Sequence, residues 1–166
     1  MPELAQWPTE QASEVSWNDL PVKARLCEGW CTFRLKILSD WETTAARLGL
    51  PNIGMATSSA VAIGPGDWLI FCPEEQRENV LAKIALSQGY AVETSDALVM
   101  LDLGDAAEIL SGLTGLNVES FGSGRATRTK LAGIGVILTT ADDGSLRMIF
   151  DISYARHMRR FLEYAI

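Results

Sequence analysis

The sequence predicts an α+β fold in which one short supersecondary unit occurs twice. Short apolar runs alternate with amphipathic segments, and turns that contain glycine or proline separate them. The order strand, helix, hairpin, helix is the same in residues 21–95 and in residues 96–166, with little residue identity between the two. We therefore expect two halves that pack side by side as one compact unit.

Composition limits the partners that a chain of this size can bind. Of its 166 residues, 48% are hydrophobic and 21% are charged, which is enough apolar material for a core. The formal net charge is −7, and a field of that sign repels polyanions, so we expect no nucleic-acid partner. No apolar run approaches the roughly 20 residues that span a bilayer, and the N-terminus has no apolar signal segment. We expect a cytoplasmic protein without membrane contact.

Local signals define the elements of the first half. Residues 1–20 are polar and aperiodic, and they are expected to form an N-terminal arm. Asp40, with Ser39 as the alternative, is a suitable N-cap for a helix that ends near Gly49. Pro73 suits the first position of a second helix, and Gly89 suits its C-cap. The expected elements are, in order, a strand over 24–38, a helix over 39–50, a hairpin over 59–72 around the turn "GPGD", and a helix over 73–90.

The second half repeats this order. The expected elements are a strand over 97–104, a helix over 105–116 capped by Asp105, two strands within 130–150 joined by the turn "ADDG", and a helix over 153–166. The apolar stripe of the last helix consists of Tyr154, Met158, Phe161, Leu162 and Ala165. Two ferredoxin-like βαββα halves account for the pattern.

The basic stretch 124–130, "GRATRTK", has two interpretations. Arg128 and Lys130 alternate with Thr127 and Thr129, which is typical of the solvent-facing side of an edge strand. A phosphate-binding loop is the alternative. The stretch lies between a helix and a hairpin strand, so we favour the edge strand, with a partner contact as its function.

The residues needed for catalysis or for metal binding are scarce. The single histidine, His157, lies among arginines that disfavour a poised general base. Two or more histidine ligands are impossible, and the spacing of Cys27 and Cys31 fits neither a zinc site nor a redox pair. The turn "GPGD" lacks the Lys-Ser/Thr ending of a phosphate loop. We therefore expect no catalytic, cofactor-binding or metal-binding residues in this chain.

Surface residues remain as candidates for function. Tryptophan outside a periodic element often marks a contact surface, and cations on an acidic protein can dock an acidic partner. The candidate partner interface consists of Trp7, Trp17, Arg125, Arg128, Arg156 and Arg160.

Several segments together resemble one family. They are "AIGPGDWLIFCP", the strand and helix "LDLGDAAEIL", the strand lead-in "TRTKLAG", and the terminal "ISYARHMRRFLEYA". From about residue 60 to the end, the chain resembles the gamma subunit of bacterial heterotetrameric sarcosine oxidase. "ISYA", residues 152–155, stands where family members usually have an Arg-Ser-Phe-Ala-like tetrapeptide, so the arginine is missing here.

The resemblance implies a fold similar to that of folate-binding aminomethyltransferase domains, in an accessory subunit without a cofactor of its own. Its partners would be larger alpha and beta flavoprotein subunits. FAD, FMN, NAD and tetrahydrofolate are the cofactors implied for the complex, which oxidatively demethylates sarcosine to glycine and hydrogen peroxide. The implied role of this chain is assembly.

Two other functions remain open. A free-standing folate or one-carbon binder of the same fold needs an acidic residue in a pocket between the halves, and Asp102 and Glu119 are candidates. A small homo-oligomeric protein of other function would use the N-terminal arm, with Trp7 and Trp17 buried across a two-fold axis.

Overall fold

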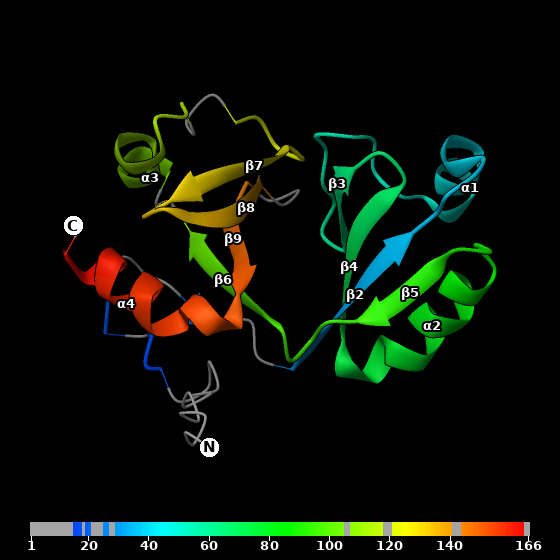
Figure 1. The fold of residues 1–166 in the computed structure, drawn as a ribbon, viewed down its shortest axis with the longest axis horizontal. Helices are drawn as coiled ribbons and strands as arrows, with labels where there is room; N and C mark the ends of the chain where they lie inside the picture. The colour runs from blue at the N-terminus through cyan, green and yellow to red at the C-terminus, as the bar shows by residue number, and fades with distance from the viewer. Residues whose placement is uncertain are drawn as a thin grey trace, which may run out of the picture.

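Two antiparallel sheets, each with helices on one face, make up the fold (Figure 1). The structure is a computed structural model that describes residues 15–17, 19–20, 25–26, 29–104, 107–117, 121–140 and 144–164. Sheet packing against helices within two connected halves confirms the predicted α+β class.

The first sheet has four strands. Their order across the sheet is β3 (Ala60–Gly64), β4 (Asp67–Pro73), β2 (Trp30–Lys36) and β5 (Tyr90–Glu93). The helices of this half are α1 (Trp41–Leu48), the 3₁₀ turn η2 (Glu74–Gln76) and α2 (Arg77–Ala85).

The second sheet has five strands. Their order is β1 (Arg25–Leu26), β6 (Leu98–Gly104), β9 (Leu146–Asp151), β8 (Ile134–Thr140) and β7 (Ala126–Leu131). The helices of this half are α3 (Ala107–Thr114), the 3₁₀ turn η4 (Ile152–Tyr154) and α4 (Ala155–Tyr164).

The predicted strand 24–38 is divided between the two sheets. Strand β1 ends at Leu26, β2 begins at Trp30 after Gly29, which has a φ of 72°, and the two strands pair in different sheets. Arg25 pairs with Asp102 of β6, while Phe33 pairs with Ile70 of β4. Trp17, Leu20 and the strand β1 therefore pack with the second half.

Turns with positive φ divide other expected elements. The run that was expected as a single strand at 130–140 turns at Ala132 and Gly133, with φ values of 53° and 79°, which suits a two-residue hairpin between β7 and β8. In the first half, Pro73 ends β4 and is the N-cap of η2, which continues into α2, so it lies one position before the helical segment instead of at its first position. Helix α2 ends at Ala85. Gly89 does not cap α2 but leads into β5, an edge strand that the sequence pattern did not predict.

Other local predictions are confirmed. Gly49 ends α1 with a φ of 68°, and its amide and that of Leu50 donate to carbonyls of the last turn. Asp40 is the N-cap residue of α1, although its side chain makes no capping hydrogen bond. The basic stretch forms β7 at the edge of its sheet, with Arg128 and Lys130 exposed.

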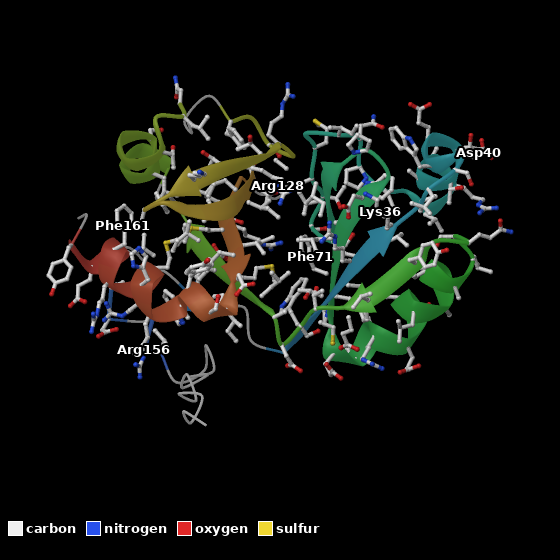
Figure 2. All side chains as sticks on the ribbon, viewed as in Figure 1. Lys36, Asp40, Phe71, Arg128, Arg156 and Phe161 are labelled. Carbon is white, nitrogen blue, oxygen red and sulfur yellow. The ribbon has the colours of Figure 1, made fainter. Side chains whose placement is uncertain are left out.

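Three apolar clusters hold the fold together. Phe33, Leu35 and Trp68 pack under α1 and α2, and the Trp68 indole donates to the Pro51 carbonyl at 2.9 Å. A second cluster packs β6, β8 and β9 against α4. The third lies between the two sheets, where Phe71 points from β4 toward the second half (Figure 2). The members of this third cluster are Ala56, Val61, Leu69, Phe71, Met100, Ala126 and Ile149.

Among the described residues, no helix is both long and apolar enough to cross a membrane.

The β3–β4 turn generates a stability prediction. Gly66 has a φ of 64°, and a Cβ added there would lie 2.3 Å from the carbonyl oxygen of Ile37. The same glycine's carbonyl accepts a hydrogen bond from the Ile37 amide at 2.8 Å, so the contact cannot open freely. We expect Gly66→Ala to lower the free energy of unfolding by about 2 to 3 kcal/mol. Urea unfolding followed by circular dichroism measures it.

The matched control is Gly64→Ala in the same hairpin. Nothing lies within 4 Å of a Cβ at that position, and its φ is not positive. We expect a change below about 0.5 kcal/mol. Equal losses for the two variants would contradict the steric explanation.

Candidate partner interface

The helix α4 buries one face and presents the other to solvent. The carboxylate of Asp151 accepts from the Ser153 amide at 2.9 Å, which caps the turn that leads into α4. Met158 and Leu162 are buried against the second sheet, as the stripe predicted. Phe161 is half-buried, and Tyr154 is exposed instead of buried. Ala165, also assigned to the stripe, lies outside the described residues.

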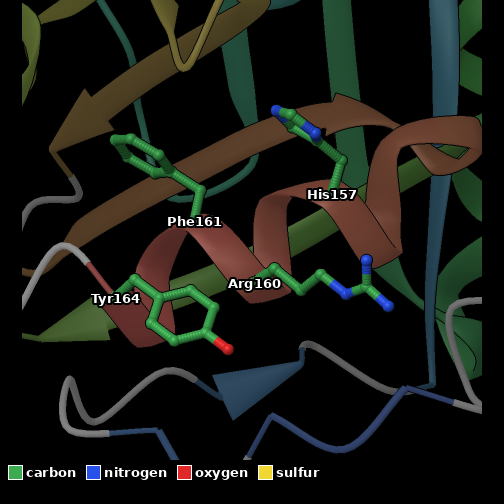
Figure 3. Close-up of a pocket in the computed structure, with 4 residues that line it drawn as sticks. All are labelled: His157, Arg160, Phe161 and Tyr164. Carbon is green, nitrogen blue, oxygen red and sulfur yellow. The ribbon is translucent and has the colours of Figure 1, made fainter.

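A shallow hollow of about 300 Å³ runs along the outward side of α4 (Figure 3). His157, Arg160, Phe161 and Tyr164 line it, at the i, i+3, i+4 and i+7 positions of one helix face. The Nε2 atom of His157 lies 3.3 Å from the carbonyl oxygen of Ala132 in the β7–β8 turn. A guanidinium beside two aromatic rings suits a carboxylate flanked by an apolar side chain.

Two residues of this hollow were not identified from the sequence. Phe161 was assigned to the apolar stripe, and Tyr164 was not singled out. The spacing of these two aromatic residues with His157 and Arg160 is visible in the sequence and could have identified the face. Nothing local in the sequence shows that the β7–β8 turn lies beside it.

Arg159, on the same helix as Arg156 and Arg160, bonds to a segment near the N-terminus. Its Nε donates to the Ser16 carbonyl at 2.7 Å, and its other nitrogens pair with Asp19 at 2.9 Å and with Glu163 at 3.1 Å. The hydrogen bond from Ser16, together with Arg159, holds the pKa of Asp19 below its ordinary value. Arg159 therefore fastens the segment around Ser16 to α4.

Trp17 is part of this chain's own core. Its side chain is 3% exposed, and its ring packs edge-on against the Phe150 ring, with 6.2 Å between the ring centroids. An indole buried in this way is not on the surface of the chain, so we remove Trp17 from the candidate interface. Trp7, the other predicted tryptophan, lies outside the described residues.

The four candidate arginines do not form one surface. Arg156 and Arg160 are exposed on α4, which covers one face of the second sheet. Arg128 pairs with Ile137 of the cluster between the sheets, so it lies on the opposite face. Arg125 is exposed just before β7, where its amide donates to the Thr140 hydroxyl at 3.0 Å. Figure 2 shows Arg128 and Arg156 well apart.

The candidate folate anchors are only partly described. The Asp102 carboxylate, on β6, accepts a hydrogen bond from the Gly104 amide at 3.1 Å. Glu119 lies outside the described residues.

The cysteines are placed for packing. Cys31 and Cys72 are buried and face each other across β2 and β4, and Cys27 lies outside the described residues. Burial, reinforced by a contact with Glu74, raises the pKa of Cys31 to about 12, so it stays a thiol at neutral pH. The described residues contain no group of three or more His, Cys, Asp or Glu side chains that could hold a metal ion.

Comparison with known proteins defines the class of fold. No family model matches the chain, and no curated protein matches its sequence. The arrangement of its elements is shared with the glycine cleavage system aminomethyltransferase T from Bartonella henselae, with a TM-score of 0.62 and 11% identity. That match covers 84% of this chain and 44% of the aminomethyltransferase chain. The expected aminomethyltransferase-like fold is confirmed.

A second solved structure with the same fold is a heterotetrameric sarcosine oxidase, from Corynebacterium sp. U-96, in complex with pyrrole 2-carboxylate. The match has a TM-score of 0.71 and 22% identity, and it covers 87% of this chain and 83% of that chain. At this identity the likeness establishes the fold.

The contacts of Arg159 generate the second prediction. We expect Arg159→Ala to cost about 1 kcal/mol or more, because the Ser16 carbonyl loses a charge-assisted hydrogen bond. The amides of residues 15–20 should then exchange hydrogen faster than in the wild type. Urea unfolding and hydrogen exchange with mass spectrometry measure the two effects.

Arg160→Ala is the control on the same helix. Arg160 is exposed and lines the hollow, so its loss should leave the stability and the exchange at residues 15–20 nearly unchanged. If both variants loosen the segment equally, the Arg159 contacts are not what holds it.

Proposed function

We propose that the chain is a non-catalytic, gamma-type accessory subunit of a flavin-dependent sarcosine oxidase complex. The observation that carries this proposal is the fold shared with a chain of heterotetrameric sarcosine oxidase over 87% of this chain and 83% of that chain. Coverage of both chains supports an equivalent subunit instead of a domain of a larger enzyme.

In this proposal the chemistry belongs to the partners. The larger alpha and beta chains carry the flavins and NAD, oxidise sarcosine, and pass the one-carbon unit to tetrahydrofolate. The present chain contributes a folded surface, as its scarcity of candidate catalytic side chains suggests. The methylated amine that is oxidised is determined by another chain.

The proposed contact surface is the outward face of α4. Arg156 and Arg160 present positive charge on a chain whose formal net charge is −7. The hollow next to Arg160 offers aromatic rings for apolar contacts. Complementary charge accelerates encounter and orients partners, while the rings supply affinity after water is excluded. Arg125, just before β7, and Arg128, on the other face of the sheet, are proposed as separate contacts.

Purification from the source cell tests the subunit assignment. With this chain as bait under native conditions, we expect larger chains to co-elute in fixed stoichiometry and the eluate to absorb visible blue light as flavoproteins do. A colourless eluate that contains this chain alone would contradict the assignment.

A charge reversal tests the α4 surface. We expect Arg160→Glu to weaken assembly with the flavin-bearing chains about tenfold or more, because it places like charge against an acidic partner. Surface plasmon resonance measures the affinity. Lys83→Glu is the control, since Lys83 is exposed on α2 and its reversal changes the net charge equally. Equal weakening by both variants would show a general charge effect instead of a local contact.

A free-standing folate binder is the second candidate. It is favoured by the fold shared with an aminomethyltransferase, although this chain spans only 44% of that protein's length. Titration of the isolated chain with tetrahydrofolate, followed by tryptophan fluorescence, distinguishes the candidates. Saturable binding that Asp102→Asn abolishes would favour the folate binder over the accessory subunit.

A further inference from the structure

One face of the first sheet is only partly covered by the second half. Phe33 and Leu35 of β2 point toward the helices, so Arg34 and Lys36 point to the opposite face. On that face Leu69 of β4 is buried in the cluster between the sheets. Farther across the sheet, β2 and β5 extend beyond this cover (Figure 1).

Four side chains occupy the uncovered part of this face. Val92 is the cross-strand partner of Arg34, and Tyr90 is the partner of Lys36, so all four point the same way. Tyr90 is 69% exposed and Val92 is 62% exposed, which is unusual for large apolar side chains on neighbouring positions of one strand face. We call this set, Arg34, Lys36, Tyr90 and Val92, the β5 patch.

The patch carries a net positive charge. Arg34 binds the buried Asp67 carboxylate through two nitrogens, at 3.1 and 2.8 Å, and Lys36 lies 3.5 Å from it. Burial opposes ionisation of Asp67, but the hydrogen bond and charge of Arg34 outweigh it and hold the pKa of Asp67 below its usual range. Two cations against one carboxylate leave one positive charge. The side chains of Arg34 and Lys36 remain 53% and 46% exposed.

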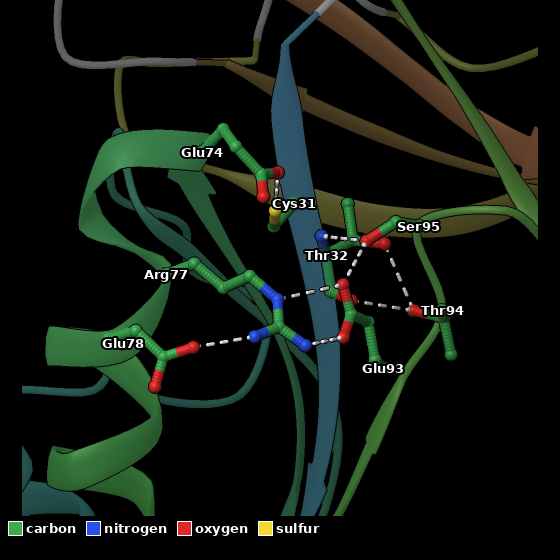
Figure 4. A network of polar contacts seen from close by, with 8 residues as sticks. All are labelled: Cys31, Thr32, Glu74, Arg77, Glu78, Glu93, Thr94 and Ser95. Atoms are coloured by element: carbon green, nitrogen blue, oxygen red, sulfur yellow. Dashed lines mark hydrogen bonds and ion pairs between the residues drawn. The ribbon is translucent and has the colours of Figure 1, made fainter.

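The strand that carries Tyr90 and Val92 is held firmly from its other face (Figure 4). Arg77 of α2 donates to both oxygens of Glu93, at 2.6 and 3.4 Å. The Thr94 amide donates to the Thr32 carbonyl at 2.8 Å, which continues the pairing of β5 with β2. A patch fixed in place loses little conformational entropy when it binds.

These observations favour one kind of occupant. A second copy of this chain packed face to face would set positive charge against positive charge. A partner surface that combines acidic and apolar side chains would meet both the cations and the exposed side chains of Tyr90 and Val92. We propose that the β5 patch docks such a surface of the larger flavin-bearing chains, as a contact separate from α4. This inference rests on the proposed function, because it takes its partner from there.

Hydrogen exchange of the full-length chain, alone and assembled with the flavin-bearing chains that co-purify with it, tests the docking. We expect the amides of residues 90–93 to exchange more slowly in the complex. We also expect Val92→Glu to weaken assembly about tenfold, because it removes an apolar contact and adds repulsion toward an acidic partner. Raising the ionic strength should weaken assembly of the wild type.

Ala91→Glu is the matched control. Ala91 is also exposed on β5 but points to the helix-covered face, as its partner Leu35 does. It should assemble within about twofold of the wild type. If Val92→Glu proves unfolded by circular dichroism, Val92→Ser replaces it and should weaken assembly in the same direction.

The outcomes separate the two proposals. A complex that forms while residues 90–93 stay unprotected, and that tolerates Val92→Glu, overturns the docking and leaves the subunit assignment intact. Failure of any complex to form overturns both. A dimer of the isolated chain that Val92→Glu dissociates would identify a second copy as the occupant and overturn the acidic partner.

Discussion

Apolar packing between the two sheets is the constraint on which the rest of the structure depends. Leu69 and Phe71 from the first sheet meet Met100 and Ile149 from the second. Each sheet is covered by helices on its other face, so the contact between the sheets covers the remaining apolar face of each and joins the two halves into one unit. It also determines which surfaces stay available. The region between the sheets is filled by side chains, and the outward side of α4 and the edge strand β5 of the first sheet remain exposed.

Charge is distributed in keeping with this geometry. Acidic side chains give the chain its net charge of −7, yet the exposed side of α4 and the uncovered face of β2 both carry arginine or lysine. Some cationic side chains are paired within the chain. Arg159 binds the Ser16 carbonyl and the Asp19 carboxylate, and Arg77 forms an ion pair with Glu93. Neighbouring arginines on one helix therefore have separate functions. Arg159 stabilises the monomer, and Arg160 is exposed beside aromatic rings.

Much of the fold could be predicted because its signals are local. Gly49 ends a helix where its φ is positive, the turn before Asp67 closes a hairpin, and the alternation around Arg128 identifies an edge strand. The predictions were wrong where the structure depends on a contact between residues far apart in the sequence, because a local pattern holds no information about such a contact. The division of the strand 24–38 depends on pairing with β6, some 75 residues later, as the register of Arg25 with Asp102 shows. Likewise, Trp17 looked like a contact residue because its partner Phe150 is remote in the sequence.

The path of the chain between the halves has a consequence for synthesis on the ribosome. Residues 30–93 contain the four strands of the first sheet and its helices, so the helix-covered face of this sheet can pack as soon as these residues emerge. The second half needs both ends of the chain, since Asp19 meets Arg159 across 140 positions. The segment that holds Trp17 must therefore wait, with an apolar ring unprotected, until β9 and α4 have been made. During that interval the nascent chain exposes the apolar Trp17 ring beside a half whose own strands and helices are already complete.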